Sequence, residues 1–151
     1  MKFAVSNIAL TEFNHGEELQ ALAQMGFRGL EVSPSRVWRD WGPGLTGAAI
    51  EAYRRRVEDV GLTIVGLHTL FWGRPELGLF RDKDVTGATM DFLVHLSSLC
   101  ALLGGHTLVF GSGGARRRGP LPFDIAVTEC VNFFTQMAPR IETHDTCFAF
   151  E

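Results

Sequence analysis

The feature that most constrains this chain is a repeated join between a predicted helix and a short apolar strand. The join occurs four times, at residues 25–31, 60–68, 103–111 and 145–151. A unit that recurs in this way indicates a repeated supersecondary structure, and a helix followed by an apolar strand is the unit of βα folds. The sequence therefore predicts an α/β domain built from βα repeats.

The first three joins contain a glycine where the helix is expected to end, and the fourth does not. A helix commonly ends at a residue in the left-handed conformation, which glycine adopts without the steric penalty of a Cβ atom. Gly26, Gly61 and Gly104 are therefore predicted helix ends. The strands that follow are nearly continuous apolar runs, which is typical of a parallel sheet with helices over both faces.

A pass along the chain divides it into five strands and four helices. The predicted strands are 3–8, 27–32, 62–68, 106–110 and 146–151, and the predicted helices are 16–25, 46–60, 86–103 and 122–142. Thr46 is a suitable N-cap for the second helix. Helical spacing predicts two buried stripes, made of Ile50, Tyr53, Val57 and Val60 in the second helix and Val127, Val131, Phe134, Ala138 and Ile141 in the fourth.

Composition is that of a soluble globular domain, with 46% hydrophobic residues, 21% charged residues and a net charge of −3. Residues 1–6 do not have the character of a signal peptide, and the apolar runs fall short of the roughly 18 residues of a membrane span. We therefore expect a cytoplasmic protein with no membrane partner. The three cysteines, Cys100, Cys130 and Cys147, share no CxxC spacing and are expected to be buried free thiols.

The long loops of the chain follow strands, whereas the connections from helix to strand are short. In parallel α/β folds, ligands bind beyond the carboxyl ends of the strands. Loops 33–45 and 69–85 lie there and carry the three tryptophans, Trp38, Trp41 and Trp72. Each tryptophan either contacts a ligand or packs under its own loop, and the sequence leaves both roles open.

Five parallel strands fit either an open doubly wound sheet or just over half of an eight-stranded barrel. An open nucleotide-binding sheet would have a glycine fingerprint after its first strand, and residues 7–11 contain no glycine. The glycine-rich loop 111–116 lacks the third glycine of that fingerprint and the Gly-Lys-Ser/Thr ending of a P-loop. The sequence therefore predicts no nucleotide site, and an open sheet and a barrel both remain possible at this point.

The segments 25–31, 66–68, 103–112 and 148–151 resemble, in order and spacing, the xylose-isomerase-like TIM barrel family. More narrowly, the chain is similar to the sugar phosphate isomerase/epimerase group, which includes hydroxypyruvate isomerases and ketose 3-epimerases. The resemblance implies a (β/α)8 TIM barrel, of which residues 1–151 form a single incomplete domain with the first four βα units and strand 5.

The resemblance implies a metal-dependent isomerase or epimerase of a small sugar or a related hydroxy-carbonyl compound. In the family, a glutamate at the end of the fifth strand binds a divalent cation and takes part in proton transfer, and this position is Glu151. A carboxylate can remove a proton beside a carbonyl, and a hard cation can stabilise the resulting enediolate. The implied ion is Mn²⁺, Mg²⁺ or Co²⁺, with Zn²⁺ less expected.

Three further residues are candidate substrate contacts. His68 ends the third strand at a position that commonly faces the active site in the family, although a packed histidine is also possible. Glu31 ends the second strand and either binds sugar hydroxyls or pairs with a nearby arginine, Arg36 or Arg39. Trp72 follows the third strand. The other histidines, His15, His95, His106 and His144, are assigned no chemistry.

The chain also resembles, more distantly, the type IV apurinic endonucleases, in which a histidine at the place of His68 is a zinc ligand. Such a site would have a second ligand after the fourth strand, where this chain has Phe110, Gly111 and Ser112. The acidic net charge also does not favour a nucleic-acid partner. Arg116, Arg117 and Arg118 either recognise a substrate phosphate or form a solvated surface.

A complete barrel has about 250 residues, so the expected partners include a missing C-terminal half-barrel or a second copy of this chain. The apolar first and fifth strands would otherwise be open edges, which favours dimerisation or aggregation. The small-molecule partner implied is a sugar or sugar phosphate. Two alternatives remain open, namely another metal-dependent barrel enzyme, such as a dehydratase or endonuclease, and a sugar-binding half-barrel without catalysis.

Overall fold

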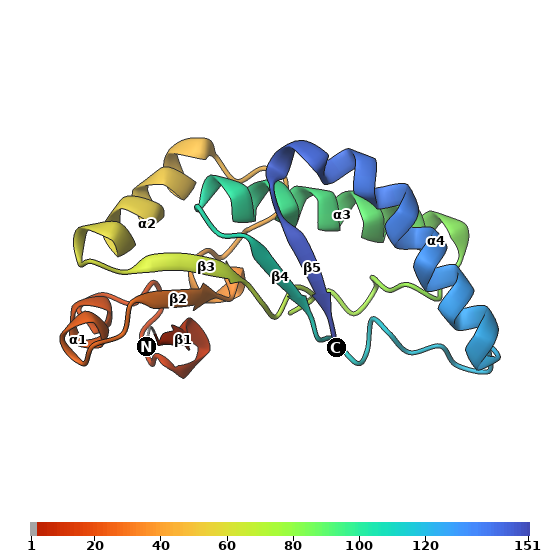
Figure 1. The fold of residues 1–151 in the computed structure, drawn as a ribbon, viewed down its shortest axis with the longest axis horizontal. Helices are drawn as coiled ribbons and strands as arrows, with labels where there is room; N and C mark the ends of the chain where they lie inside the picture. The colour runs from red at the N-terminus through yellow and green to blue at the C-terminus, as the bar shows by residue number, and fades with distance from the viewer. Residues whose placement is uncertain (1–2) are drawn as a thin grey trace.

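A computed structural model describes residues 3–151 of the chain, in which helices and strands alternate (Figure 1). The elements are β1 (Ala4–Ser6), α1 (Glu18–Gln24), β2 (Gly29–Val32), α2 (Gly47–Asp59), β3 (Thr63–Leu67), α3 (Lys83–Leu102), β4 (Thr107–Phe110), α4 (Phe123–Ile141) and β5 (Cys147–Phe150). Three short 3-10 helices, η1 (Asn7–Ala9), η2 (Pro34–Arg36) and η3 (Glu142–His144), complete them. The prediction of four βα units followed by a fifth strand is confirmed.

The five strands form one parallel sheet in the order β1-β2-β3-β4-β5, which is also their order in the sequence. In a doubly wound sheet the later strands are added on the other side of β1, as in the order 3-2-1-4-5-6, so that β1 lies inside the sheet. A strictly sequential order is instead that of a barrel wall. The open doubly wound alternative is therefore wrong for this chain.

Helices α2, α3 and α4 lie side by side over one face of the sheet (Figure 1). The other face, which would be the inside of a closed barrel, leaves Val65, Cys147 and Ala149 exposed. The expectation of helices over both faces was wrong. The strands are apolar on both faces for two reasons. One face packs under the helices, and the inside of a closed barrel is filled by side chains from its own strands.

The predicted helix ends are confirmed, because Gly26, Gly61 and Gly104 have φ angles of 93°, 84° and 80°. After α2, the N–H of Gly61 donates to the carbonyl of Glu58 at 2.8 Å, and the N–H of Leu62 donates to the carbonyl of Val57 at 3.2 Å. This pair of hydrogen bonds is a Schellman motif, which satisfies the last carbonyls of a helix and turns the chain into the next strand.

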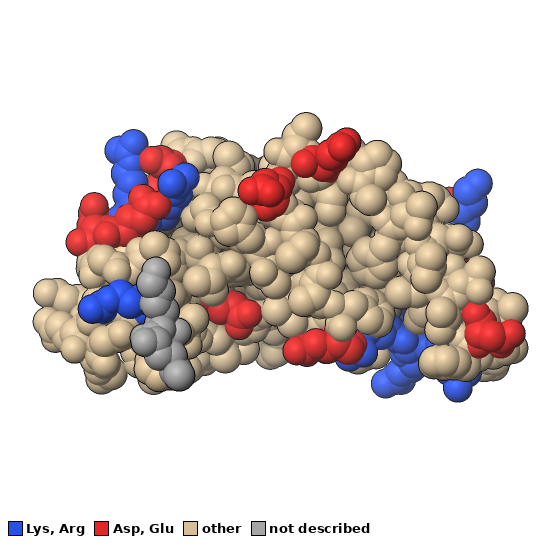
Figure 2. Space-filling model, viewed as in Figure 1, with Lys and Arg blue, Asp and Glu red and all other residues tan. Residues whose placement is uncertain are grey.

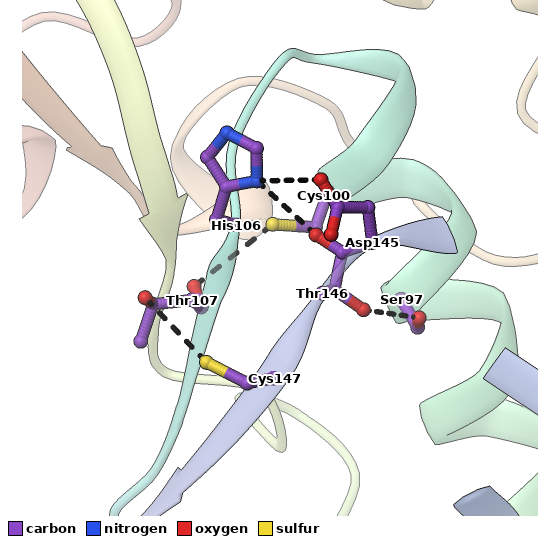
Figure 3. Close-up of polar contacts among 7 residues, drawn as sticks. All are labelled: Ser97, Cys100, His106, Thr107, Asp145, Thr146 and Cys147. Atoms are coloured by element: carbon purple, nitrogen blue, oxygen red, sulfur yellow. Dashed lines mark hydrogen bonds and ion pairs between the residues drawn. The ribbon is translucent and has the colours of Figure 1, made fainter. Parts of the chain in front are cut away.

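The fourth join has no glycine, and Asp145 occupies the left-handed conformation there, with φ 53° and ψ 44°. Aspartate is one of the few other residues that visit this region. The Nδ1 atom of His106 lies 3.1 Å from the carbonyl oxygen of Asp145, and the hydroxyls of Ser97 and Thr146 lie 2.7 Å apart (Figure 3). The first contact joins the amino ends of β4 and β5, and the second joins α3 to the amino end of β5, at the end of the sheet associated with stability.

The buried stripe predicted for α2 is confirmed, since Ile50, Tyr53 and Val57 are buried. Thr46 is the N-cap, and its hydroxyl accepts a hydrogen bond from the N–H of Ala49 at 3.3 Å. The cap satisfies one of the free N–H groups at the start of the helix. Sequence pattern alone was sufficient here because the apolar residues of α2 lie on one face.

The stripe predicted for α4 was wrong. Val127 and Val131 are 45% and 59% exposed and Ala138 is also exposed, whereas the helix buries Ala126, Phe133 and Met137. Phe134 and Ile141 are partly buried against the core. The helix carries apolar side chains on two faces, so the periodicity does not decide which face meets the sheet.

Charged side chains in Figure 2 gather at the margins of the face shown and are sparse at its centre. Over α2, acidic and basic atoms lie together, in agreement with the ion pairs of Arg54 with Glu58 and of Arg55 with Glu51. Basic atoms also gather near the connection from β4 to α4, which contains the run from Arg116. Exposed pairs of this kind contribute little to stability.

All three cysteines are free, but they are not all buried. Cys100 is fully buried, and burial raises the pKa of its thiol to about 12. Cys130 is half-buried, and Cys147 is exposed on the inner face of β5. The prediction was wrong for Cys147, because that face has no covering layer among residues 3–151.

Helix α3 has the length and apolar composition of a membrane-spanning helix, which the apolar runs of the sequence did not indicate. One side of α3 is fully buried in the core, and the residues there include Leu93, Leu96, Leu99 and Cys100. A core helix of a globular fold is apolar for the same reason as a membrane helix, since both bury side chains. The packing of α3 on the sheet accounts for its composition.

Candidate active site

A cavity of about 330 Å³ lies at the carboxyl ends of β3, β4 and β5. This is the end of a parallel sheet at which ligands bind. The cavity combines one carboxylate, one imidazole, two hydroxyls and aromatic walls, and its lining residues are His68, Thr69, Phe71, Trp72, Val109, Gly111, Ser112 and Glu151. Three strands that are adjacent only in the folded sheet thus bring together residues spread over more than half of the chain.

Glu151 follows β5 directly and is positioned by the parallel pairing of β5 with β4. Its N–H donates to the carbonyl of Phe110 at 3.4 Å. The carboxylate lies over Gly111, so close that a Cβ atom at Gly111 would be only 2.7 Å from Oε2. The glycine therefore provides the space that the carboxylate occupies at the edge of the cavity.

Both ring nitrogens of His68 lie within hydrogen-bonding distance of protein hydroxyls. Nε2 is 2.7 Å from the hydroxyl of Ser6, and Nδ1 is 2.9 Å from the hydroxyl of Thr69. Burial lowers the pKa of His68, while the negative charge of Glu31 acts in the opposite direction. His68 is therefore a neutral, oriented imidazole at neutral pH.

Ser6 was not identified from the sequence. It ends β1, pairs in register with Glu31, and also accepts a hydrogen bond from the N–H of Ile8 at 3.2 Å. The available signal was its place at the end of the first strand, because polar residues at strand ends face the mouth of a barrel. Its contact with His68 depends on the alignment of β1, β2 and β3, which no local pattern shows.

Glu31 is half-buried near the end of β2, and it does not line the cavity. Its negative charge acts to raise the pKa of His68, against the larger effect of burial. Among residues 3–151, no ion pair joins Glu31 to Arg36 or Arg39. Arg36 instead donates to the carbonyl of Leu10 at 2.8 Å. The expected contact of Glu31 with a substrate stays a prediction.

The three tryptophans have different environments. Trp41 is buried, with its ring 5.4 Å from that of Phe92, and Trp38 is half-buried, with its ring 5.4 Å from that of Tyr53. Trp72 is 65% exposed and forms part of the cavity wall. Two tryptophans thus pack under their own loops, and Trp72 alone presents its ring at this cavity.

The arginine run after β4 does not line the cavity. The guanidinium of Arg116 lies 5.5 Å from the centre of the Phe150 ring, and Arg118 donates to the carbonyl of Leu121. Both arginines line a separate hollow beside α4. The suggested contact with a substrate phosphate therefore has no geometric support at the cavity of Glu151.

The remaining histidines make structural contacts. His15 is fully buried, with Nε2 3.0 Å from the side-chain amide of Asn7. His95 Nε2 lies 3.0 Å from the carbonyl oxygen of Trp41, and His144 Nδ1 lies 2.7 Å from the hydroxyl of a serine in α3. None of these histidines lines the cavity of Glu151.

A divalent cation is only partly accommodated by the residues that the structure describes. Glu151 is the only carboxylate that lines the cavity, and the described part of the chain contains no group of three histidine, cysteine or acidic side chains that could hold a metal ion. Zinc sites use three or four protein ligands, and Mg²⁺ is usually held by one or two carboxylates together with waters and substrate phosphates. Residues 3–151 therefore supply at most part of a metal site.

Sequential parallel strands with a polar cavity at their carboxyl ends define a chain of the (β/α)8 barrel class. Residues 19–151 match the family described as xylose isomerase-like TIM barrel, and the chain belongs to this family. A search of curated protein sequences finds no match.

Several solved structures share the fold. D-psicose 3-epimerase from Clostridium cellulolyticum H10 is 17% identical with a TM-score of 0.71, and the match covers 98% of this chain and 51% of that chain. 3-keto-D-glucoside 4-epimerase from E. coli is 16% identical with a TM-score of 0.69, and the match covers 99% of this chain and 55% of that chain. A sugar phosphate isomerase/epimerase from Parabacteroides distasonis ATCC 8503 is 17% identical with a TM-score of 0.64, and the match covers 99% of this chain and 50% of that chain. This chain spans about half the length of these barrels.

Proposed function

We propose that this chain provides part of the active site of a sugar isomerase or epimerase, in which Glu151 transfers a proton next to a carbonyl group. The observation that carries the proposal is the position of the Glu151 carboxylate, at the end of β5 and at the edge of a cavity with hydroxyl and aromatic walls. Membership of the xylose isomerase-like family and the likeness to solved epimerases support the same reaction class.

The chemistry requires a base, hydrogen-bond donors and a surface for the sugar. Carbon-bound hydrogen beside a carbonyl is acidic enough for a positioned carboxylate to remove it, and returning the proton to the other face or the next carbon gives epimerisation or isomerisation. The hydroxyls of Thr69 and Ser112 can donate to the oxygen on which negative charge develops. The exposed ring of Trp72 offers an apolar surface for the carbon-bound hydrogens of a sugar.

We further propose that Glu151 is one ligand of a divalent cation, Mn²⁺, Mg²⁺ or Co²⁺, and that the other ligands lie outside these 151 residues. When bound, such an ion supplies positive charge that polarises a carbonyl oxygen. Calorimetric titration of Mn²⁺ into the longest protein that the gene encodes, and into its Glu151→Gln variant, tests this role. Binding that weakens at least tenfold in the variant supports it, and equal binding refutes it.

The number of strands in this chain indicates what would close the barrel. A barrel of this class has eight strands, and this chain supplies five. Two copies of the chain would bring ten strands, which is too many for one closed barrel of this class. We propose that three further βα units, from the same protein or from a second chain, cover the inner face on which Val65 and Ala149 are exposed.

The test of the function is a survey of ketohexoses, aldohexoses and their phosphates as substrates for the longest encoded protein, with products separated by chromatography. The expected result is reversible formation of an epimer or a ketose–aldose pair, which is lost in the Glu151→Gln variant. Elimination of water instead of isomerisation would indicate a dehydratase on the same barrel. Turnover that persists in the variant would refute the role of Glu151.

A second candidate is a sugar-binding half-barrel without catalysis. It is favoured by the exposed ring of Trp72 in the cavity wall, which could bind a sugar without any metal ion. In this case, sugars would quench the fluorescence of Trp72 in the presence of a chelator, and no product would form. A Trp72→Phe variant identifies the signal, because the other two tryptophans are buried or half-buried.

A further inference from the structure

Thr69 adopts a backbone conformation that is unusual for its residue type. Its φ angle is +54°, in the left-handed region. A β-branched residue in that region is a genuine outlier, because its branched Cβ crowds the backbone. Residues held in such conformations persist only where the surrounding structure fixes them, and they cluster at ligand-binding and catalytic sites. Thr69 lines the cavity of Glu151 and is therefore placed where strain has a functional use.

The strained residue sits at the end of a chain of hydrogen bonds. The hydroxyl of Ser6 lies 2.7 Å from Nε2 of His68, and Nδ1 of His68 lies 2.9 Å from the hydroxyl of Thr69. A neutral imidazole has one N–H donor and one acceptor nitrogen, so these two contacts have a direction. Burial favours the neutral form of His68, in which only one of the two ring nitrogens carries a proton.

The contacts of Ser6 are compatible with one direction in particular. Its hydroxyl oxygen accepts the N–H of Ile8 at 3.2 Å with one lone pair, and donation of its own proton to Nε2 gives the hydroxyl one hydrogen bond as acceptor and one as donor. The ring proton of His68 then resides on Nδ1 and is donated to the oxygen of Thr69. The hydroxyl proton of Thr69 is not used in that contact and can be directed into the cavity. Hydrogen bonds arranged in series polarise one another, which strengthens the last donor.

We propose that the hydroxyl of Thr69, polarised by His68, donates a hydrogen bond to the substrate, and that Ser6 is a positioning residue for His68. The inference deepens the proposed function and rests on it for the identity of the ligand. A donor at this place recognises an oxygen that accepts, namely a carbonyl oxygen or the enediolate oxygen formed from it. His68 contributes through Thr69, because both of its nitrogens are engaged by protein hydroxyls.

The tautomer of His68 is the first test and needs no substrate. Two-bond ¹⁵N–¹H spectra of histidine-labelled protein above neutral pH, with the His68 signals assigned by their loss in His68→Gln, report which nitrogen carries the proton. We expect the Nδ1–H form to predominate, and Ser6→Ala to shift the population toward Nε2–H. Ser112→Ala, which alters another hydroxyl of the same cavity, should leave the tautomer unchanged. A predominant Nε2–H form in the unaltered protein would overturn the proposal.

The second test measures sugar turnover by the longest encoded protein. Thr69→Ala should lower kcat/KM at least tenfold, whereas Thr69→Ser, which keeps the hydroxyl, should retain most of it. Equal activity in the Ala and Ser variants would overturn the substrate contact. If the unaltered protein neither binds nor converts sugars while the Nδ1–H form is observed, the proposed function fails and the substrate contact with it, but the order Ser6–His68–Thr69 stands.

Discussion

The carboxylate of Glu151 occupies the space that a side chain at Gly111 would fill, because a Cβ atom there would lie 2.7 Å from Oε2. The glycine after β4 and the glutamate after β5 are 40 positions apart in the sequence, and parallel pairing of the two strands brings them together. The absence of a side chain at one position thus determines where the charge at the other lies.

Substitution of Gly111 by alanine should therefore move the carboxylate without unfolding the protein. The clashing atom is the end of a flexible side chain, so the free energy of unfolding should change by less than about 1 kcal/mol. A catalytic group displaced by about 1 Å can cost on the order of 100-fold in rate. Denaturant unfolding and turnover measurements test both effects in the Gly111→Ala variant.

The matched control is Gly113→Ala, in the same loop, where a Cβ atom would meet nothing within 4 Å. This variant should change neither stability nor turnover. Equal losses of turnover in the two variants would show that the loop, rather than the position of Glu151, limits the reaction.

Substitution of Gly66 by alanine should cause a large loss of stability. Gly66 lies in β3, in register with Thr107 of β4, and a Cβ atom there would collide with the backbone carbonyl of Thr107. Backbone in a paired strand cannot give way easily, so Gly66→Ala should cost about 3 kcal/mol or more in the free energy of unfolding. Urea midpoints measure the change.

Gly87→Ala provides a control of opposite sign. Gly87 lies inside α3, and a Cβ atom added there would meet no atom within 4 Å. Alanine should therefore gain about 0.5–1 kcal/mol of stability at this position through its higher helix propensity. A stable Gly66→Ala variant would contradict the close approach of β3 and β4.

Asp145 replaces the glycine of the other three helix-to-strand joins and holds a φ angle of 53°. Asp145→Gly should raise the free energy of unfolding by about 0.5–1 kcal/mol, because glycine adopts this conformation without steric cost. Asp145→Ala should lower it by about 1 kcal/mol. Thermal unfolding of the two variants tests the prediction, and identical midpoints would contradict it. The carboxylate of Asp145 is largely exposed and lies 3.8 Å from His106, which makes its loss a small effect.

The buried His15 predicts a dependence of stability on pH. Burial is the main cause that lowers its pKa, and Glu12, Glu18, Arg36 and Arg56 also affect it. Because the folded protein holds the imidazole neutral, the unfolded chain binds the proton more readily. Stability should be unaffected by this group above its unfolded pKa of about 6.5 and should fall as the pH is lowered below that value.

Urea unfolding between pH 7.5 and 5 measures this slope, and His15→Gln should reduce it. The exposed His106→Gln is the control and should leave the slope unchanged. A slope that is the same in the unaltered protein and the His15→Gln variant would show that other groups, such as His68, dominate the acid response. The pKa of His68 is also lowered by burial, so some slope should remain in the variant.

The backbone of the repeat could be predicted from the sequence because its signals are local. Gly26, Gly61 and Gly104 mark helix ends through their own conformational freedom, and the spacing of the repeat placed Glu151 at the end of a strand. The face of α4 could not be predicted, since its apolar side chains occupy two faces and only the sheet decides between them.

The hydrogen bonds of the site were harder to predict from the sequence, and one of them joins residues that are far apart in the chain. Ser6 and His68 are 62 positions apart, and their contact depends on the register of three strands. The left-handed conformation of Thr69 has no sequence signal, because threonine is among the residues least expected there. Trp72 was a candidate substrate contact from the sequence, but the packing of Trp38 and Trp41 on the core could not be predicted, because it depends on how their loop folds back.

The central claim is that the carboxylate of Glu151 moves a carbon-bound proton of a sugar. The most direct measurement is the exchange of that proton with solvent in ²H₂O, followed by ¹H NMR, for the longest encoded protein and its Glu151→Gln variant with a ketohexose that is turned over. The account predicts loss of the signal of one proton beside the carbonyl in the unaltered protein, at a rate at least 100-fold lower in the variant, as expected for removal of a catalytic base. Exchange at equal rates in the two proteins would contradict it.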